Sequence, residues 1–170
     1  MITMKHQLTQ QDIQKMEEEI EYRKLVVRKE ALEDVKTARA QGDLSENFEY
    51  KAAKQYKNQN ESRIRYLERM IKGADVIDDT SAEDEVGLHN TVTVYIEEDD
   101  EEETYRIVTT ARGNSLKGMI SIESPLGKAL LGHKVGDRVH IVVNADYGYD
   151  VIVRKIENTP EDDSEVLRKF

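Results

Sequence analysis

Two carboxylates, Asp43 and Glu46, stand three residues apart in a short polar stretch of this 170-residue chain. Carboxylate oxygens are the ligands that Mg²⁺ prefers in proteins, and residues three apart around a tight turn can point to one side. Two carboxylates alone fill too few positions for a good Mg²⁺ site. We therefore expect incomplete metal ligation here, which a partner molecule completes.

The same stretch also fits a purely structural interpretation. Gly42 is suited to end one helix, and Asp43 or Ser45 to cap the next. Glu46 and Glu49 would then favour the positive end of that second helix. Leu44 resists this interpretation, because an apolar side chain at an exposed turn has little capping value. The residues alone leave both interpretations open.

Basic residues follow the carboxylates. Between 50 and 72 the cations are Lys51, Lys54, Lys57, Arg63, Arg65, Arg69 and Lys72, and they outnumber the carboxylates of this segment. They form either a solvated helix face or a contact surface for nucleic-acid phosphates or an acidic channel wall. Arg39, Lys51 and Lys54 lie within a turn or two of the carboxylates, which favours contact for these three.

Two long helices must position these residues. Residues 11–40 contain no Gly or Pro and carry apolar residues near helical spacing. Residues 45–72 place a seam at alternating steps of three and four, made of Tyr50, Ala53, Lys57, Asn60, Ile64, Leu67 and Ile71. Helices of similar length joined by a short turn run antiparallel. Residues 1–76 are therefore predicted to form a coiled-coil hairpin reaching roughly 40 Å, with its tip near 42–50.

After residue 76 the hydrophobic period changes to two. Strands are predicted at 91–96, 104–108, 118–122, 138–143 and 150–156. Ser124 as N-cap, Pro125 at the first helical position and Gly132 beyond the end predict one short helix. Residues 77–158 are thus expected to form a second domain of α+β class with a mostly antiparallel sheet, and 159–170 a polar tail. The acidic run 97–103 is predicted to be a hydrated hairpin loop, because it lacks the glycine and ligand spacing of a Ca²⁺-binding loop.

Composition excludes several classes of protein. The formal net charge is −10, with the acidic excess in 77–170, and there are no cysteines. The absence of cysteine excludes disulfides, thiolate nucleophiles and cysteine-based zinc sites. We expect a cytoplasmic protein without a membrane span, because no signal-peptide or membrane-spanning stretch is present. No nucleophilic triad or phosphate-binding glycine loop appears, so we expect no enzyme active site in the chain itself.

Two segments resemble a known family. Residues 38–54, ARAQGDLSENFEYKAAK, are similar to the tip signature of the bacterial Gre transcription elongation factors, GreA type, and residues 120–137, ISIESPLGKALLGHKVGD, to that family's C-terminal domain. The resemblance implies an FKBP-like second domain docking at the rim of the secondary channel of bacterial RNA polymerase. It also implies that the coiled coil enters the channel, where the tip helps hold a second Mg²⁺ while the polymerase hydrolyses the 3′ end of backtracked RNA.

The resemblance assigns roles by position. The tip carboxylates fall on Asp43 and Glu46, with Ser45 in support, and the RNA-contacting basic patch falls on Arg39 and Lys54, with Lys51 beside them. The docking segment is expected at Ser124, Pro125, Leu126 and Gly127. No stably bound cofactor is expected, and the chain is expected to be a monomer.

Two residues depart from the family pattern. Phe48 stands where many relatives have Ala, and Lys29 where some have Pro, which should leave the first helix unkinked. The alternatives are a coiled-coil inhibitor or adaptor of polymerase, and an FKBP-like prolyl isomerase or chaperone. The intact Asp43 and Glu46 favour stimulation of cleavage over inhibition. A prolyl isomerase would need an aromatic-lined pocket, for which the second half offers few aromatic residues.

Overall fold

The computed structural model describes residues 5–42, 47–78, 81–114, 117–159 and 166–169. It divides into two compact units. One is formed mainly by Gln10–Ala74, and the other by Gln7–Thr9 together with Asp75–Lys169. The predicted fold class, a helical hairpin followed by a domain with a mostly antiparallel sheet, is confirmed.

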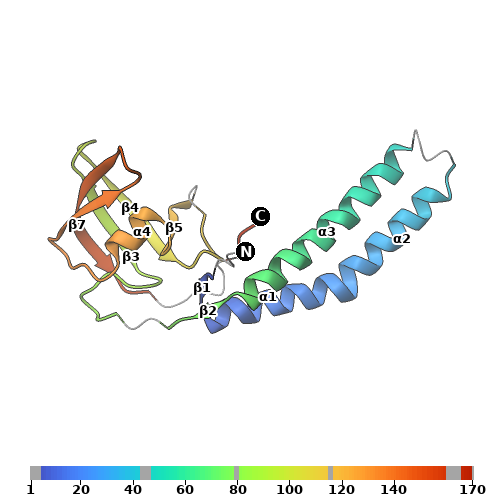
Figure 1. Cartoon of the computed structure of the whole chain (residues 1–170), viewed down its shortest axis with the longest axis horizontal. Coiled ribbons are helices and arrows are strands. Elements are labelled where there is room, and N and C mark those ends of the chain that lie inside the picture. The colour runs from blue at the N-terminus through green and yellow to red at the C-terminus, as the bar shows by residue number, and fades with distance from the viewer. Residues whose placement is uncertain (1–4, 43–46, 79–80, 115–116, 160–165, 170) are drawn as a thin grey trace. The chain divides into compact units, whose positions relative to one another are not determined.

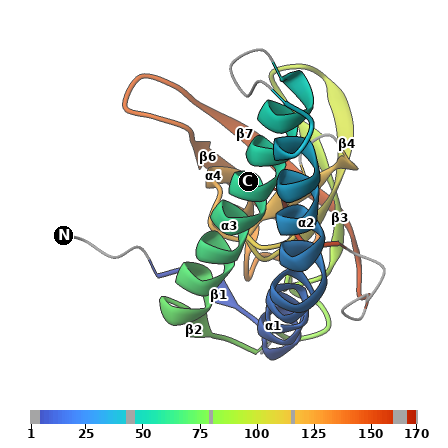
Figure 2. The same cartoon turned by 90° about the vertical axis from the view of Figure 1, so that its right-hand side faces the viewer.

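The first unit is a helical hairpin. Its first arm consists of α1 (Gln10–Tyr22), a π-helical segment η1 (Arg23–Val27) and α2 (Arg28–Arg39). Its second arm is the 25-residue helix α3 (Phe48–Lys72). Figures 1 and 2 show α2 and α3 lying side by side along their length.

The predicted seam on α3 is buried against the first arm. Asn60, Ile64 and Leu67 are each at most 2 % exposed. Tyr50, Ala53, Lys57 and Ile71 are half-buried, whereas Lys54 and Gln55 between them are exposed. The buried apolar residues of the first arm are Met16, Val27, Ala31 and Ala38. The alternating three- and four-residue spacing thus predicted the packed face of α3 correctly.

The first arm differs from the prediction of one regular, unkinked helix over 11–40. At η1 the backbone N–H of Arg28 donates to the carbonyl oxygen of Arg23, five residues earlier. The side-chain amide of Asn60 donates to the same oxygen at 3.3 Å. Figure 1 shows the arm changing direction here, as π-bulges commonly make helices do. The absence of Pro at Lys29 therefore does not make this arm straight.

A layer of polar contacts crosses the hairpin beside η1. Arg63, whose side chain is 7 % exposed, donates through Nε to Glu19 Oε2 at 2.7 Å. Arg23 donates to the same carboxylate at 2.8 Å and to Asn60 Oδ1 at 3.0 Å. Burial raises the pKa of Glu19, but hydrogen bonds from Arg63 and Arg23 outweigh it and hold that pKa below its ordinary value of 4.5. Glu19 is therefore ionised at neutral pH.

The second unit contains a five-stranded sheet in the order β5-β4-β3-β7-β6. The strands are β3 (Thr91–Ile96), β4 (Glu101–Val108), β5 (Met119–Ser121), β6 (Arg138–Val142) and β7 (Gly148–Glu157). Within the described part of this sheet, β4 and β5 form the one parallel pair, and the other neighbouring strands are antiparallel. Each of the five overlaps a strand that the period-two pattern predicts, although β4 begins three residues earlier than predicted.

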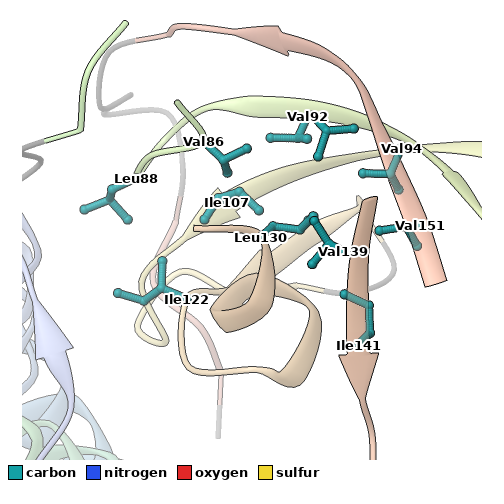
Figure 3. Close-up of a cluster of buried hydrophobic side chains, with 11 residues drawn as sticks. Val86, Leu88, Val92, Val94, Ile107, Ile122, Leu130, Val139, Ile141 and Val151 are labelled. Atoms are coloured by element: carbon teal, nitrogen blue, oxygen red, sulfur yellow. The ribbon is translucent and has the colours of Figure 1, made fainter. Parts of the chain in front are cut away.

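The helix α4 (Pro125–Leu130) contributes to the core of this unit. Leu130 is fully buried, and Figure 3 shows it among valine and isoleucine side chains from the strands. The strand residues of this core cluster are Val92, Val94, Ile107, Val139, Ile141, Val151 and Val153. Alternate residues of β3 and β6 enter this core, because successive side chains of a strand point to opposite faces.

Two further expectations need correction or addition. Glu101–Glu103, predicted within a loop, form the start of β4 and pair with Val94–Ile96 of β3. Strand pairing uses the backbone, so three exposed glutamates can occupy a strand while their carboxylates stay in water. The sequence also gave no sign of β1 (Gln7–Leu8) and β2 (Asp75–Val76), which pair in parallel and are too short to show a period.

Arg63→Met should lower the free energy of unfolding of the hairpin by about 2–3 kcal/mol, because it keeps the buried stem but leaves Glu19 with one fewer guanidinium. Urea unfolding followed by far-ultraviolet circular dichroism measures this change. Arg65→Met is the matched control: Arg65 is an exposed arginine of the same helix, and its replacement should change stability by less than about 0.5 kcal/mol. Equal effects of the two replacements would show that the Arg63–Glu19 pair does not stabilise the hairpin.

Candidate functional site

The hairpin narrows to a connection between the end of α2 and the start of α3. The first arm ends at Arg39, and Ala40 is its C-cap. Gly42 has a φ of 120°, a backbone conformation that residues other than glycine rarely adopt. The sequence predicts Gly42 as the cap that ends the first arm, but the C-cap is Ala40 and Gly42 follows it by two residues. Asp43, Leu44, Ser45 and Glu46 lie outside the described residues, so their role as metal ligands or supporting groups stays a prediction.

Asn47 joins the two arms at the tip. Its side-chain oxygen accepts a hydrogen bond from the backbone N–H of Tyr50 at 3.0 Å, which makes it the N-cap of α3. Its side-chain nitrogen donates to the carbonyl oxygen of Ala38 at 2.8 Å, in the last turn of α2. An amide can do both because it carries a donor and an acceptor.

The capping interpretation of Asp43 or Ser45 is therefore wrong for α3, which begins three residues later than predicted. The sequence contained a signal for the correct cap, since Asn is among the most favoured N-cap residues and stands directly before Phe48. Asp43 and Ser45 are also favoured N-cap residues, so the sequence alone does not single out Asn47. With Asn47 in this role, the start of α3 does not require a carboxylate as its cap.

Arg39 pairs with Tyr50 across the two arms. Its Nη2 lies 3.5 Å from the Tyr50 hydroxyl, and its guanidinium carbon lies 5.7 Å from the ring centroid. The hydrogen bond from Arg39 lowers the pKa of Tyr50, and the charges of Lys54 and Lys57 act in the same direction. Two of the predicted basic residues, Arg39 and Lys54, thus act on one tyrosine near the tip.

Lys51 pairs with the other aromatic residue of the tip. Its Nζ lies 5.7 Å from the centroid of the Phe48 ring. Arg39, Lys51 and Lys54 are all exposed. The described part of the tip therefore presents cations that can reach phosphate groups, on a framework that Asn47 holds together. Among the described residues there is no cluster of three His, Asp or Glu side chains able to hold a metal ion.

The predicted docking segment has a clear structural role in its own unit. Ser124 caps α4, since its Oγ accepts from the Gly127 N–H at 3.1 Å and donates to the Ser121 carbonyl at 2.6 Å. A Cβ at Gly127 would lie 2.1 Å from that carbonyl oxygen, so no other residue fits without backbone movement. Leu126 packs against the core, while Pro125 is exposed. Docking through this segment stays a prediction.

Two family models match the chain in order. Residues 6–76 match the N-terminal domain of the transcription elongation factors, and residues 81–158 match the C-terminal domain of GreA and GreB. The chain belongs to the GreA/GreB family of transcription elongation factors.

This GreA/GreB family member is 50% identical over 139 residues to the transcription elongation factor GreA of Thermoanaerobacter pseudethanolicus, covering 81% of this chain and 88% of the relative. It is 43% identical over 153 residues to GreA of Streptococcus pneumoniae, covering 89% and 95%. Among solved structures, GreA factor homolog 1 of Thermus thermophilus matches with 27% identity and a TM-score of 0.43, over 91% of this chain and 100% of that chain. No helix within the described residues of this family member is both long and apolar enough to cross a membrane.

Replacing Asn47 should loosen the tip of this family member in two separable ways. Asn47→Ala removes both hydrogen bonds and should cost about 1 kcal/mol of cap stability, so the Tyr50 amide should exchange several-fold faster with solvent. Asn47→Asp keeps the acceptor for Tyr50 but cannot donate to Ala38. The Asn47→Asp variant should keep the Tyr50 amide protected from exchange. It should speed exchange of the Gln41 amide, which donates to the same Ala38 carbonyl. Amide hydrogen exchange by NMR measures both exchange rates. Unchanged rates in Asn47→Ala would contradict the proposal that Asn47 links the two arms.

Proposed function

We propose that this Gre-family chain binds bacterial RNA polymerase through its secondary channel and stimulates the polymerase's own cleavage of backtracked nascent RNA, which rescues arrested complexes. The chain acts as an activator and not as an enzyme by itself. The observation that carries this proposal is the Asn47 link between the arms. Asn47 holds together the helix ends that flank Asp43 and Glu46 in the sequence. Because Asn47 is the N-cap of α3, neither carboxylate is needed for capping.

The donor set at the tip fits a shared Mg²⁺ ion. Asp43 and Glu46 offer hard carboxylate oxygens, which suit Mg²⁺, and they occupy fewer positions than its six-coordinate shell contains. The remaining positions fall to the polymerase, to substrate phosphate and to water. When bound, such an ion supplies charge stabilisation for phosphodiester hydrolysis. This chain's own part is to present the two carboxylates at the end of a stiff arm.

The basic residues serve a second purpose in the proposed complex. Arg39 and Lys54 are exposed near the tip, and Lys51 lies one turn into α3. Phosphates of the extruded RNA are the anions that these cations would meet inside the channel. The same cations compensate the repulsion that two added carboxylates would otherwise exert on RNA. Carboxylates at the turn with cations along the arms therefore suit an approach to a metal ion and a polyanion together.

Replacing both Asp43 and Glu46 by Ala should abolish stimulated cleavage and leave polymerase binding largely intact, because the carboxylates are proposed to act on the ion and not on docking. The measurement mixes the variant with a stalled, backtracked bacterial elongation complex and resolves short RNA products on a gel. Binding is measured in parallel by competition with the wild-type chain. Normal cleavage by the double variant would rule out the metal-completing role, and a wild-type chain that binds but only inhibits would make it a channel inhibitor.

Arg39→Ala and Lys54→Ala should each weaken cleavage, and the loss should depend on salt. A phosphate contact releases counterions, so removing one cation should lower the slope of log activity against log salt by roughly one. Cleavage rates from 50 to 200 mM KCl measure this slope. Lys72→Ala, at the far end of α3, is the matched control and should keep the wild-type slope. A slope unaltered in all three variants would mean that Arg39 and Lys54 form only a solvated face.

A further inference from the structure

Phe48 is placed where the fold makes little use of it. It is the first residue of α3, and 80% of its surface is exposed. Phe forms helices less readily than Ala, and an exposed ring gains little hydrophobic stabilisation. Within the described residues, its recorded ring contact is the Lys51 ammonium at 5.7 Å. Neither helix propensity nor core packing therefore accounts for an aromatic residue at this position.

The surroundings of Phe48 have a recognisable chemistry. Two aromatic–cation pairs stand at one end of the hairpin, Phe48 with Lys51 and Tyr50 with Arg39. Proteins that hold single-stranded nucleic acid combine aromatic faces, on which bases stack, with cations that pair with the adjoining phosphates. A single exposed ring on a protein surface is ordinary. A ring paired with a cation, two residues from a proposed metal-ligating carboxylate, is a more specific combination.

We infer that Phe48 is a stacking platform for a base of the extruded single-stranded RNA, with Lys51 beside it to pair with a phosphate. This inference rests on the proposed function and adds a residue that holds the RNA substrate. The ring accepts any base, because every base has a flat π-face, and it favours purines, which stack over a larger area. Phe48 is thus a positioning residue, and it does not touch the reacting bond.

An RNA base explains these features better than an apolar patch on the channel wall. A ring that packs into a protein pocket must be desolvated, and the ammonium at 5.7 Å would have to be displaced or buried with it. A base stacked on the ring leaves that ammonium in water beside its own phosphate. The charge on Lys51 then strengthens the contact.

The experiment uses the full-length chain with backtracked elongation complexes that carry either a purine or a pyrimidine at the RNA 3′ end. The variants are Phe48→Ala, Phe48→Leu and Phe48→Trp. Tyr56→Ala is the matched control, because Tyr56 is another exposed aromatic residue of α3, at 45% exposure and about two turns away. The readout is the factor concentration that gives half-maximal cleavage. Thermal unfolding verifies that every variant folds.

Phe48→Ala and Phe48→Leu should both raise the half-maximal concentration about tenfold and reduce the preference for a 3′ purine. Phe48→Trp should keep the wild-type half-maximal concentration and the wild-type preference. Tyr56→Ala should match the wild type. Wild-type behaviour of Phe48→Ala overturns the inference. Phe48→Leu acting like the wild type while Phe48→Ala fails also overturns it, because the contact would then be apolar packing on polymerase.

Failure of the proposed function has a different signature. A wild-type chain that binds the complexes without raising cleavage removes the proposed function. Stacking is then measured by photo-crosslinking from a 4-thiouridine at the RNA 3′ end to the chain. A crosslink that is lost in Phe48→Leu and kept in Phe48→Trp supports stacking even then. A crosslink yield independent of residue 48 overturns it.

Discussion

The geometry of the tip depends on the register of the two arms, and register is fixed by buried polar contacts. An apolar seam of Ile64, Leu67 and small residues would pack nearly as well after a slip of one heptad. Asn60 and Arg63 would not, because each needs its partner, Arg23 or Glu19, to avoid being buried without a hydrogen bond. One polar residue at a seam position is a known way of specifying coiled-coil register at some cost in stability.

Register at the middle of the hairpin determines what is possible at its end. Asn47 reaches the Ala38 carbonyl at 2.8 Å only because the two arms arrive at the tip together. A slip of one turn, roughly 5 Å, would separate this pair. The same alignment brings Arg39 to Tyr50 across the arms. The cations near the tip and the ends of its connection are thus positioned by contacts several turns away, between Glu19, Arg23, Asn60 and Arg63.

The sequence predicted well what a local period encodes. The α3 seam, the five strands and the Ser124–Pro125 helix start each follow from spacing or from one residue's conformational preference. It predicted poorly what depends on partners distant in the chain. The cap of α3 is Asn47, whose side chain bonds both the start of α3 and the carbonyl of Ala38 in the other arm. The glutamates 101–103 joined β4 because β3 was available to pair with them. The carboxylates Asp43 and Glu46 were recognised from their motif, and their arrangement is not described.

The π-helical segment has a consequence for how chains of this family correspond residue by residue. A hydrogen bond that spans five residues instead of four lets the arm hold one more residue than an α-helix with the same ends. Glu19 on one side and Ala31 on the other nevertheless both face α3. A relative whose first arm is one residue shorter can keep both faces in phase by replacing this segment with a regular turn. An alignment gap of one residue therefore belongs inside the helix, at 23–27, where length variation is normally considered forbidden.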